Sequence, residues 1–462
     1  MRDLDQTRDH PLTRRGEFAA TLRLAGPLAM ANLMQMAIAA TDVIFVARLG
    51  PTELAASSLA IAIYGLLLWT LSGLTGTVAA LISEELGRRR HAVREVRRSV
   101  RMALWLAIGC GLAALVFVPL AAPMMDLTRQ DPAIAPVAAR FLAILVLAMV
   151  PMLIANVLRN FVSALGRPIF ATAITALMIG VNALGNYALI NGHFGLPALG
   201  LEGSAVATVL TGWCFALAYV LAIRADRRLR RYSVWGHFLR PHWDRMRSLL
   251  RIGLPVGVTI LAEGGIFSAA AFMMGALGAL PLAAHTLALQ IAAVAFQVPF
   301  GIGQAATIRV GYYLGAGQPL AAGRAGWMAI AIGTGFMGLT ALLMLFAPHL
   351  LLSAYIDAAA PANAALVALA TSFMVVAAAF QLADGVQAVA MGALRGLQDT
   401  RMPMAFAVFG YWVPGLACCL WLGFLTPLAG IGIWIGLALG LFVVSALMLH
   451  RWSRREQLGL LA

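Results

Sequence analysis

Three carboxylic acid side chains lie inside long apolar stretches of this 462-residue sequence, namely Asp42, Glu263 and Asp384. A carboxylate near the centre of a bilayer costs about 2.5–3.5 kcal/mol on insertion scales, so such a residue indicates a functional site. The alternative is a structural carboxyl group that is neutral or hydrogen-bonded to a neighbouring helix. No arginine or lysine occurs at a comparable depth to neutralise the three. A proton, a sodium ion and an organic cation would therefore compete for the same charge, which is the minimum that an antiporter requires.

Amide side chains supply the next candidates. Asn182 and Asn186 are four residues apart and so share one helix face. We expect them to contribute to a cation site with Asp42, although simple hydrogen bonding between helices is an equally good explanation. Four glutamines are candidates for the polar lining of a substrate cavity: Gln35, Gln290, Gln297 and Gln381.

The composition excludes an ordinary soluble protein, because 61% of the residues are hydrophobic and only 11% are charged, against about a quarter charged in soluble domains. The net charge of +14 comes from arginine alone, since the sequence has no lysine. The arginines lie between apolar runs, which argues against nucleic acid as a partner. The four cysteines lie within apolar stretches without metal-ligand spacing, and we interpret them as packed thiols. They are Cys110, Cys214, Cys418 and Cys419.

Apolar stretches long enough to cross about 30 Å of hydrocarbon recur along the whole chain. They predict an all-α polytopic membrane protein with twelve transmembrane helices. The expected ranges are 20–48, 53–84, 100–124, 136–160, 168–191, 201–224, 249–277, 284–315, 324–350, 363–393, 402–425 and 428–450.

The distribution of arginine predicts the orientation of these helices. With the N-terminus in the cytoplasm, 30 arginines fall on the inner side, and only Arg48, Arg129 and Arg140 fall on the outer side. Both termini are then cytoplasmic. The charged N-terminal segment runs into an apolar stretch longer than the core of a signal peptide, so we expect no cleavage.

An internal repeat divides the chain. At an offset of 228 residues, Pro27 corresponds to Pro255 and Gly73 to Gly301, and several Leu-Gly pairs also coincide. The repeat predicts two six-helix bundles related by a pseudo-twofold axis along the membrane normal, with a cavity between them. The expected lobes are residues 1–224 and 249–462, joined by a basic cytoplasmic linker over residues 225–248.

Several motifs in the second half resemble those of one family, the MATE (multidrug and toxic compound extrusion) family, in its NorM-type branch. They are Ile252–Pro255 with Glu263 following, Thr307–Gly311, Asp384–Gln387, Gly392–Gly396 and Asp399–Pro403. Gly26-Pro27, Asp42 and Leu49-Gly50 fit the opening helix of the same family. Each motif alone is weak, but their order and spacing together make the resemblance specific, and it spans almost the whole chain.

The resemblance implies a twelve-helix carrier, without a cofactor, that exports cationic amphipathic drugs in exchange for protons or sodium ions. Carried over to this sequence, Glu263 and Asp384 match the cation-binding carboxylates of the C-terminal lobe, which would ligate the metal in a sodium-coupled carrier. Asp42, Asn182 and Asn186 match the polar cluster of the N-terminal lobe.

One position departs from the pattern of sodium-coupled relatives, which can carry tyrosine one turn before the aspartate of the tenth helix. Here that position is Phe380, a further residue expected to line the substrate cavity. The phenolic ligand is missing, which weakens the expectation of sodium coupling and leaves both ions open.

We therefore expect a monomeric secondary antiporter of the bacterial inner membrane that takes small organic cations, with membrane lipids around it, and not an enzyme. One alternative is a lipid-linked saccharide flippase of the same superfamily, which would need a basic cavity for pyrophosphate. Another is a polytopic membrane enzyme, which would need a clustered catalytic motif. A passive channel fits the repeat poorly. Against the enzyme, the eight histidines are dispersed: His10, His91, His193, His237, His242, His285, His349 and His450.

Overall fold

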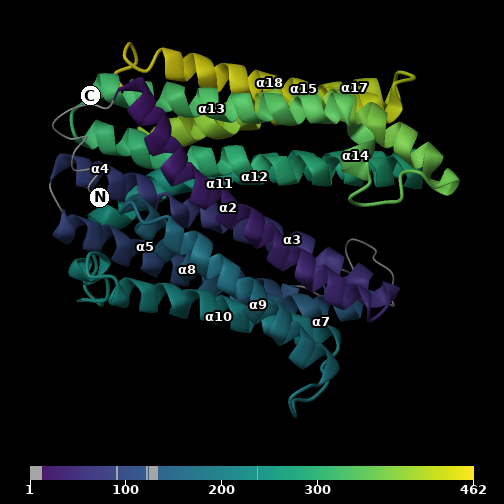
Figure 1. Ribbon diagram of the computed structural model, residues 1–462, viewed down its shortest axis with the longest axis horizontal. Helices are drawn as coiled ribbons and strands as arrows, with labels where there is room; N and C mark the ends of the chain where they lie inside the picture. The colour runs from purple at the N-terminus through teal and green to yellow at the C-terminus, as the bar shows by residue number, and fades with distance from the viewer. Residues whose placement is uncertain (1–12, 90–91, 121–122, 124–133, 237, 462) are drawn as a thin grey trace. The chain divides into compact units, whose positions relative to one another are not determined.

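The structure is a computed structural model that describes residues 13–89, 92–120, 123, 134–236 and 238–461. Within these ranges the secondary structure is helical, without strands (Figure 1). The first half contains α2 (Arg14–Ala47), α3 (Pro51–Gly76), α4 (Val78–Arg88), α5 (Val93–Ala114), α7 (Ala135–Leu145), η1 (Val146–Ala148), α8 (Met149–Ala164), α9 (Ile169–Asn191), α10 (Leu201–Ala225) and η2 (Leu229–Tyr232). The second half contains α11 (Trp243–Leu277), α12 (Ala279–Gly315), α13 (Pro319–Phe346), α14 (Pro348–Leu352), η3 (Pro361–Asn363), α15 (Ala364–Gly396), α16 (Arg401–Gly410), η4 (Tyr411–Gly415), α17 (Leu416–Phe424) and α18 (Ala429–Ser453).

Twelve helical segments of the described residues are long and apolar enough to cross a membrane, six in each half of the chain. The predicted number of helices and the all-α class are confirmed. Some spans begin earlier than expected: α2 begins at Arg14 and α11 at Trp243. Their first turns carry charged side chains, which hydropathy alone places in loops. Several predicted features, including Arg2, Arg8, His91, Arg129 and His237, lie outside the described residues.

The helices divide into two compact units, and the division does not follow the halves of the chain. Of the described residues, the first unit contains those within 30–257, and the second contains 13–29 and 258–461. Helices α2 and α11 therefore each pass from one unit to the other. The transitions follow Pro27 and Pro255 by two residues, and these are the prolines that the repeat relates. Proline removes one backbone hydrogen bond from a helix, so both transitions fall at a weakened point.

Glycines let the start of each of these two helices pack closely within its unit. In the second unit, a Cβ atom at Gly301 of α12 would lie 2.7 Å from the backbone nitrogen of Ala29. In the first unit, a Cβ atom at Gly257 of α11 would lie 3.5 Å from the carbonyl oxygen of Thr70 on α3. At the offset of 228 residues, Gly257 corresponds to Ala29, and Gly301 corresponds to Gly73, which is one helical turn after Thr70. The two contacts therefore involve related parts of the helices. Small residues let helix backbones approach closely in lipid.

In the second unit, α12 packs backbone to backbone against α15, the helix that carries Asp384. A Cβ atom at Gly392 would lie only 2.3 Å from the carbonyl oxygen of Gly303. The hydroxyl of Thr307 donates a hydrogen bond across the same contact to the carbonyl of Gly392, at 2.8 Å. Backbone contact without intervening side chains fixes the position of α15, and with it that of the Asp384 carboxyl group.

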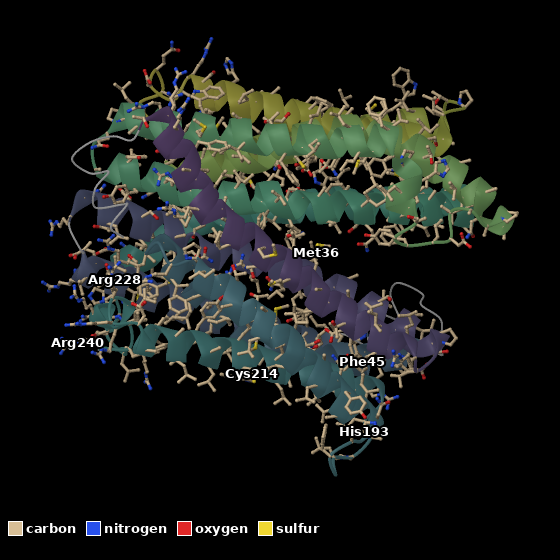
Figure 2. All side chains as sticks on the ribbon, viewed as in Figure 1. Met36, Phe45, His193, Cys214, Arg228 and Arg240 are labelled. Atoms are coloured by element: carbon tan, nitrogen blue, oxygen red, sulfur yellow. The ribbon has the colours of Figure 1, made fainter. Side chains whose placement is uncertain are left out.

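The basic segment between the halves packs on the first unit. Arg97 of α5 donates a hydrogen bond to the carbonyl of Tyr232 at 2.7 Å, and the Trp105 indole donates one to the carbonyl of Phe238 at 3.1 Å. Figure 2 shows Arg228 and Arg240 at one end of this unit and Phe45 at the opposite end. Asp42 is one helical turn before Phe45, so it lies toward the end remote from the basic segment.

Candidate cation-binding sites

The first unit contains a polar cluster around Asp42 of α2. The side-chain amides of Asn182 and Asn186, both on α9, donate hydrogen bonds to the same carboxylate oxygen of Asp42 at 3.0 and 2.6 Å. Both asparagines are fully buried, and their four-residue spacing places them on one helix face, which meets the carboxylate. The structure thus brings together the three residues that the sequence predicted for this cluster. Their role in binding a cation stays a prediction.

Two further residues of this cluster were missed by the sequence analysis. Thr208 of α10 donates a hydrogen bond to the second carboxylate oxygen of Asp42 at 3.4 Å. Tyr64 of α3 interacts electrostatically with Asp42, and its buried hydroxyl has no hydrogen-bond partner among the described residues. The side-chain oxygen of Asn186 also has no hydrogen-bond partner among the described residues. The cluster thus offers a carboxylate and two uncommitted oxygen atoms, which are the ligand types that a hard cation prefers.

The second unit contains the other two carboxyl groups, Glu263 on α11 and Asp384 on α15. Asp384 is only 4% exposed and interacts electrostatically with Glu263, which is half-buried. Neither of the two forms an ion pair with a basic residue of the described ranges. Two like charges in a low-dielectric interior repel each other, and a bound proton or cation relieves the repulsion.

Tyr411 adds a phenol to this pair of carboxyl groups. It begins the π-helical segment η4, and π-turns are frequent at functional sites. The indole of Trp412, the next residue, donates a hydrogen bond to the carbonyl of Ala262 at 3.1 Å, which attaches η4 to α11 directly beside Glu263. Tyr411 interacts electrostatically with both carboxyl groups, and its buried hydroxyl has no hydrogen-bond partner among the described residues.

Aromatic rings pack next to this site. Phe380 lies one turn before Asp384, and its ring centroid is 6.0 Å from Phe267 and 5.8 Å from Trp434. Trp434 also contacts the buried ring of His285 at 5.5 Å between centroids. Phe380 is itself only 2% exposed, so it forms part of an aromatic cluster. Sequence reasoning did not single out Tyr411 because it gave no reason to place this residue of the eleventh span near the seventh and tenth.

The four predicted glutamines have different surroundings. Gln381 is fully buried and donates a hydrogen bond to the carbonyl of Ala292, which ties α15 to α12. Gln297 is 5% exposed and bonds within its own helix. Gln35 is exposed and accepts a hydrogen bond from Arg159 at 3.2 Å. Gln290 is exposed on α12. Their role in lining a substrate cavity stays a prediction.

Comparison with known proteins assigns the family. The MatE family model matches residues 27–188 and 255–421, once in each half of the chain. The chain belongs to the MatE family. One relative of this MatE protein is a "Probable multidrug resistance protein NorM" of Mesorhizobium japonicum, 45% identical over 96% of the chain and 95% of the relative. A "Multidrug resistance protein NorM" of Burkholderia vietnamiensis is 40% identical over 94% of the chain and 93% of that protein. The resemblance drawn from the motifs is thus confirmed.

Solved structures agree with the fold of this MatE protein. A multidrug resistance MATE family transporter of the MOP superfamily, described in an outward-facing conformation, superposes with a TM-score of 0.84 at 19% identity over 96% of both chains. A MATE structure described as the bent conformation superposes with a TM-score of 0.84 at 18% identity over 99% of both chains. The chain is a multi-pass membrane protein with the MATE fold.

Proposed function

We propose that this MatE protein is a secondary antiporter that exports small organic cations, including structurally different drugs, in exchange for an inward flow of protons or sodium ions. The names of its NorM relatives support multidrug export. The observation that carries the exchange is the pair of the half-buried Glu263 and the buried Asp384, whose charges repel each other and are not neutralised by a described basic residue. A carboxyl pair of this kind holds one positive species at a time.

Exchange follows from that competition. While the cavity is open to the outside, an entering proton or sodium ion neutralises the carboxyl groups and weakens their hold on a bound organic cation, which leaves. With the carboxyl groups neutralised, the carrier returns to the state open to the cytoplasm. A ligand can shift such an equilibrium only by its differential affinity for the two states, so the coupling ion has to bind the two states unequally.

Both coupling ions remain candidates, and the site chemistry says what each would use. A proton needs only one of the two carboxyl groups. A sodium ion needs several oxygen ligands, and Glu263, Asp384 and the hydroxyl of Tyr411 would supply three of them in the second unit. Tyr411 would then replace the phenol that is missing at Phe380. In the first unit, Asp42 would work with the oxygen atoms of Asn186 and Tyr64.

The same proposal places the protein in the bacterial cell membrane, with both termini in the cytoplasm. Its apolar helices and the bacterial relatives support the cell membrane, and the arginine bias supports cytoplasmic N- and C-termini. We further propose that it acts as a monomer and needs no cofactor.

Drug efflux from proteoliposomes under separately imposed pH and sodium gradients tests the proposal. We expect a pH gradient, a sodium gradient or both to drive efflux, and Glu263→Gln and Asp384→Asn each to reduce it at least tenfold while the protein still inserts. The matched control Glu456→Gln changes an exposed carboxyl group on the same half of the chain and should leave efflux unchanged. Normal efflux by both site variants would refute the role of the pair. Efflux that proceeds without either gradient would refute the antiporter.

A further inference from the structure

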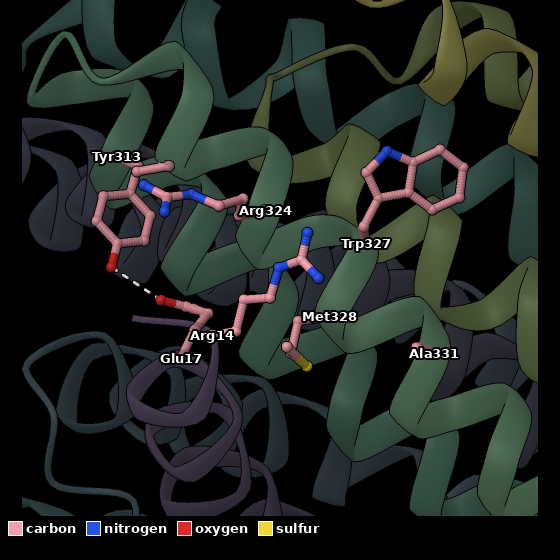
Figure 3. A pocket seen from close by; sticks show the side chains of 8 residues that line it. Arg14, Glu17, Tyr313, Arg324, Trp327, Met328 and Ala331 are labelled. Carbon is pink, nitrogen blue, oxygen red and sulfur yellow. Dashed lines mark hydrogen bonds between the residues drawn. The ribbon is translucent and has the colours of Figure 1, made fainter. Parts of the chain in front are cut away.

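A pocket of about 320 Å³ lies in the second unit, and neither Glu263 nor Asp384 lines it (Figure 3). It is formed by the first turn of α2, the last turns of α12 and the first turns of α13. These three helix ends are ends of predicted membrane spans. The pocket therefore opens at the level where the bilayer meets water, which is where phospholipid headgroups lie.

The acidic residue in the pocket wall is already neutralised. Both carboxylate oxygens of Glu17 accept hydrogen bonds from Arg309, at 2.5 and 2.7 Å, and one also accepts a bond from the hydroxyl of Tyr313 at 2.9 Å. Glu17, Arg309 and Tyr313 are each at most 5% exposed. The polar part of the pocket lining that Glu17 and Tyr313 supply is therefore held in place. Figure 3 shows the contact between Tyr313 and Glu17.

The charges that remain at the pocket are positive. Arg14 of α2 and Arg324 of α13 both line it and are both exposed. Arg324 is also close enough to Tyr313 to interact with it electrostatically. With the charge of Glu17 balanced by Arg309, the side chains of Arg14 and Arg324 leave positive charge at the pocket. Figure 3 shows the guanidinium of Arg324 beside Tyr313 and that of Arg14 turned toward Trp327. A guanidinium binds phosphate oxygens with well-defined geometry.

The rest of the pocket is apolar and follows α13 away from its charged end. Trp327, Met328 and Ala331 line this part, and Figure 3 shows the guanidinium of Arg14 between Arg324 and the indole of Trp327. Tryptophan is enriched at the headgroup level of membranes, where one end of the ring is in apolar surroundings and the other is wet. A ligand that fits both parts has an anionic head and an apolar body.

We propose that this pocket binds an anionic phospholipid, with its phosphate between Arg14 and Arg324 and the start of an acyl chain along Trp327, Met328 and Ala331. Basic pockets between transmembrane helices bind anionic headgroups by the same chemistry. A free phosphate ion would use the two arginines alone, whereas a lipid also uses the apolar wall. The site is independent of the transport proposal, since it shares no residue with the cation sites.

Thermal unfolding of the full chain in detergent, titrated with short-chain phosphatidylglycerol, phosphatidylcholine or inorganic phosphate, tests this site. We expect phosphatidylglycerol to raise the unfolding midpoint saturably and more than phosphatidylcholine does at the same concentration. The double variant Arg14→Gln/Arg324→Gln should weaken the apparent affinity for phosphatidylglycerol about 30-fold, because each arginine near an anionic headgroup contributes about fivefold. The matched control Arg401→Gln/Arg454→Gln removes two exposed arginines from other helix ends and should leave that affinity unchanged.

A second variant keeps the test decisive if the double variant does not fold. Ala331→Phe fills the apolar part of the pocket from an exposed position of α13 and leaves both arginines in place. It should weaken phosphatidylglycerol binding while any effect of inorganic phosphate persists. Equal stabilisation by the two lipids, an unchanged affinity in both pocket variants, or full stabilisation by inorganic phosphate alone would each overturn the lipid site.

Discussion

Replacing Gly392 with alanine tests how the contact between α12 and α15 positions the cation site. The added Cβ atom would lie 2.3 Å from the carbonyl oxygen of Gly303, whereas Cβ atoms essentially never come closer than 3.0 Å to another heavy atom. The atom in the way belongs to the backbone, so no side-chain rotation relieves the overlap. The two helices have to separate by at least about 0.7 Å, which is the difference between these distances.

The cost can be worked out from three contributions. Overpacking of this kind costs about 1–3 kcal/mol, and weakening of the hydrogen bond from Thr307 to the carbonyl of Gly392 adds about 0.6 kcal/mol. Alanine is the better helix former by about 1 kcal/mol, which offsets part of the loss. We therefore expect Gly392→Ala to lower the free energy of unfolding by about 0.6–2.6 kcal/mol. Because Asp384 is eight residues earlier on α15, its carboxyl group should shift and efflux should fall as well.

Unfolding in mixed detergent micelles measures this free energy, and proteoliposome efflux measures the functional effect. Gly335→Ala is the matched control, since it is also a helix glycine of the second unit but has no heavy atom within 4 Å of the new Cβ. It should be neutral or slightly stabilising. If Gly392→Ala were as stable and as active as Gly335→Ala, the close contact would not position α15.

Two further substitutions probe other polar contacts. Thr208→Val removes one hydrogen-bond donor to Asp42 and should weaken binding of the coupling cation about two- to fivefold in titrations of transport rate against cation concentration. The control Thr211→Val changes a hydroxyl that bonds only to its own helix and should have no such effect. An equal loss in both variants would contradict the role of Thr208. Glu17→Ala leaves the guanidinium of Arg309 buried without its carboxylate partner. The variant should lower the free energy of unfolding by about 3–5 kcal/mol in the same detergent assay. A decrease of less than about 1 kcal/mol would show that this ion pair does not hold α2 on α12.

The sequence was sufficient for the helices and for part of the candidate sites, for identifiable reasons. Span number follows from apolar length alone, and the spacing of Asn182 and Asn186 places both on one face without knowledge of the partner helix. Thr208 was not predictable, because threonine is common in apolar helices and usually bonds its own backbone, as it also does here. The position of Tyr411 near the two carboxyl groups and the division of α2 between the two units both depend on which helices are in contact. The periodicity of side chains within one helix carries no such information.

The passage of α2 and α11 from one unit to the other has a consequence for how the protein is made. Because the first unit extends to Gly257, it still lacks the start of α11 when its sixth span leaves the ribosome. The start of α2, which packs against Gly301 and Arg309, has to wait for almost 300 further residues before its contacts exist. Neither half of the polypeptide is therefore a self-sufficient folding module, and the nascent chain reaches its native arrangement only after the insertion machinery has delivered both halves to the bilayer.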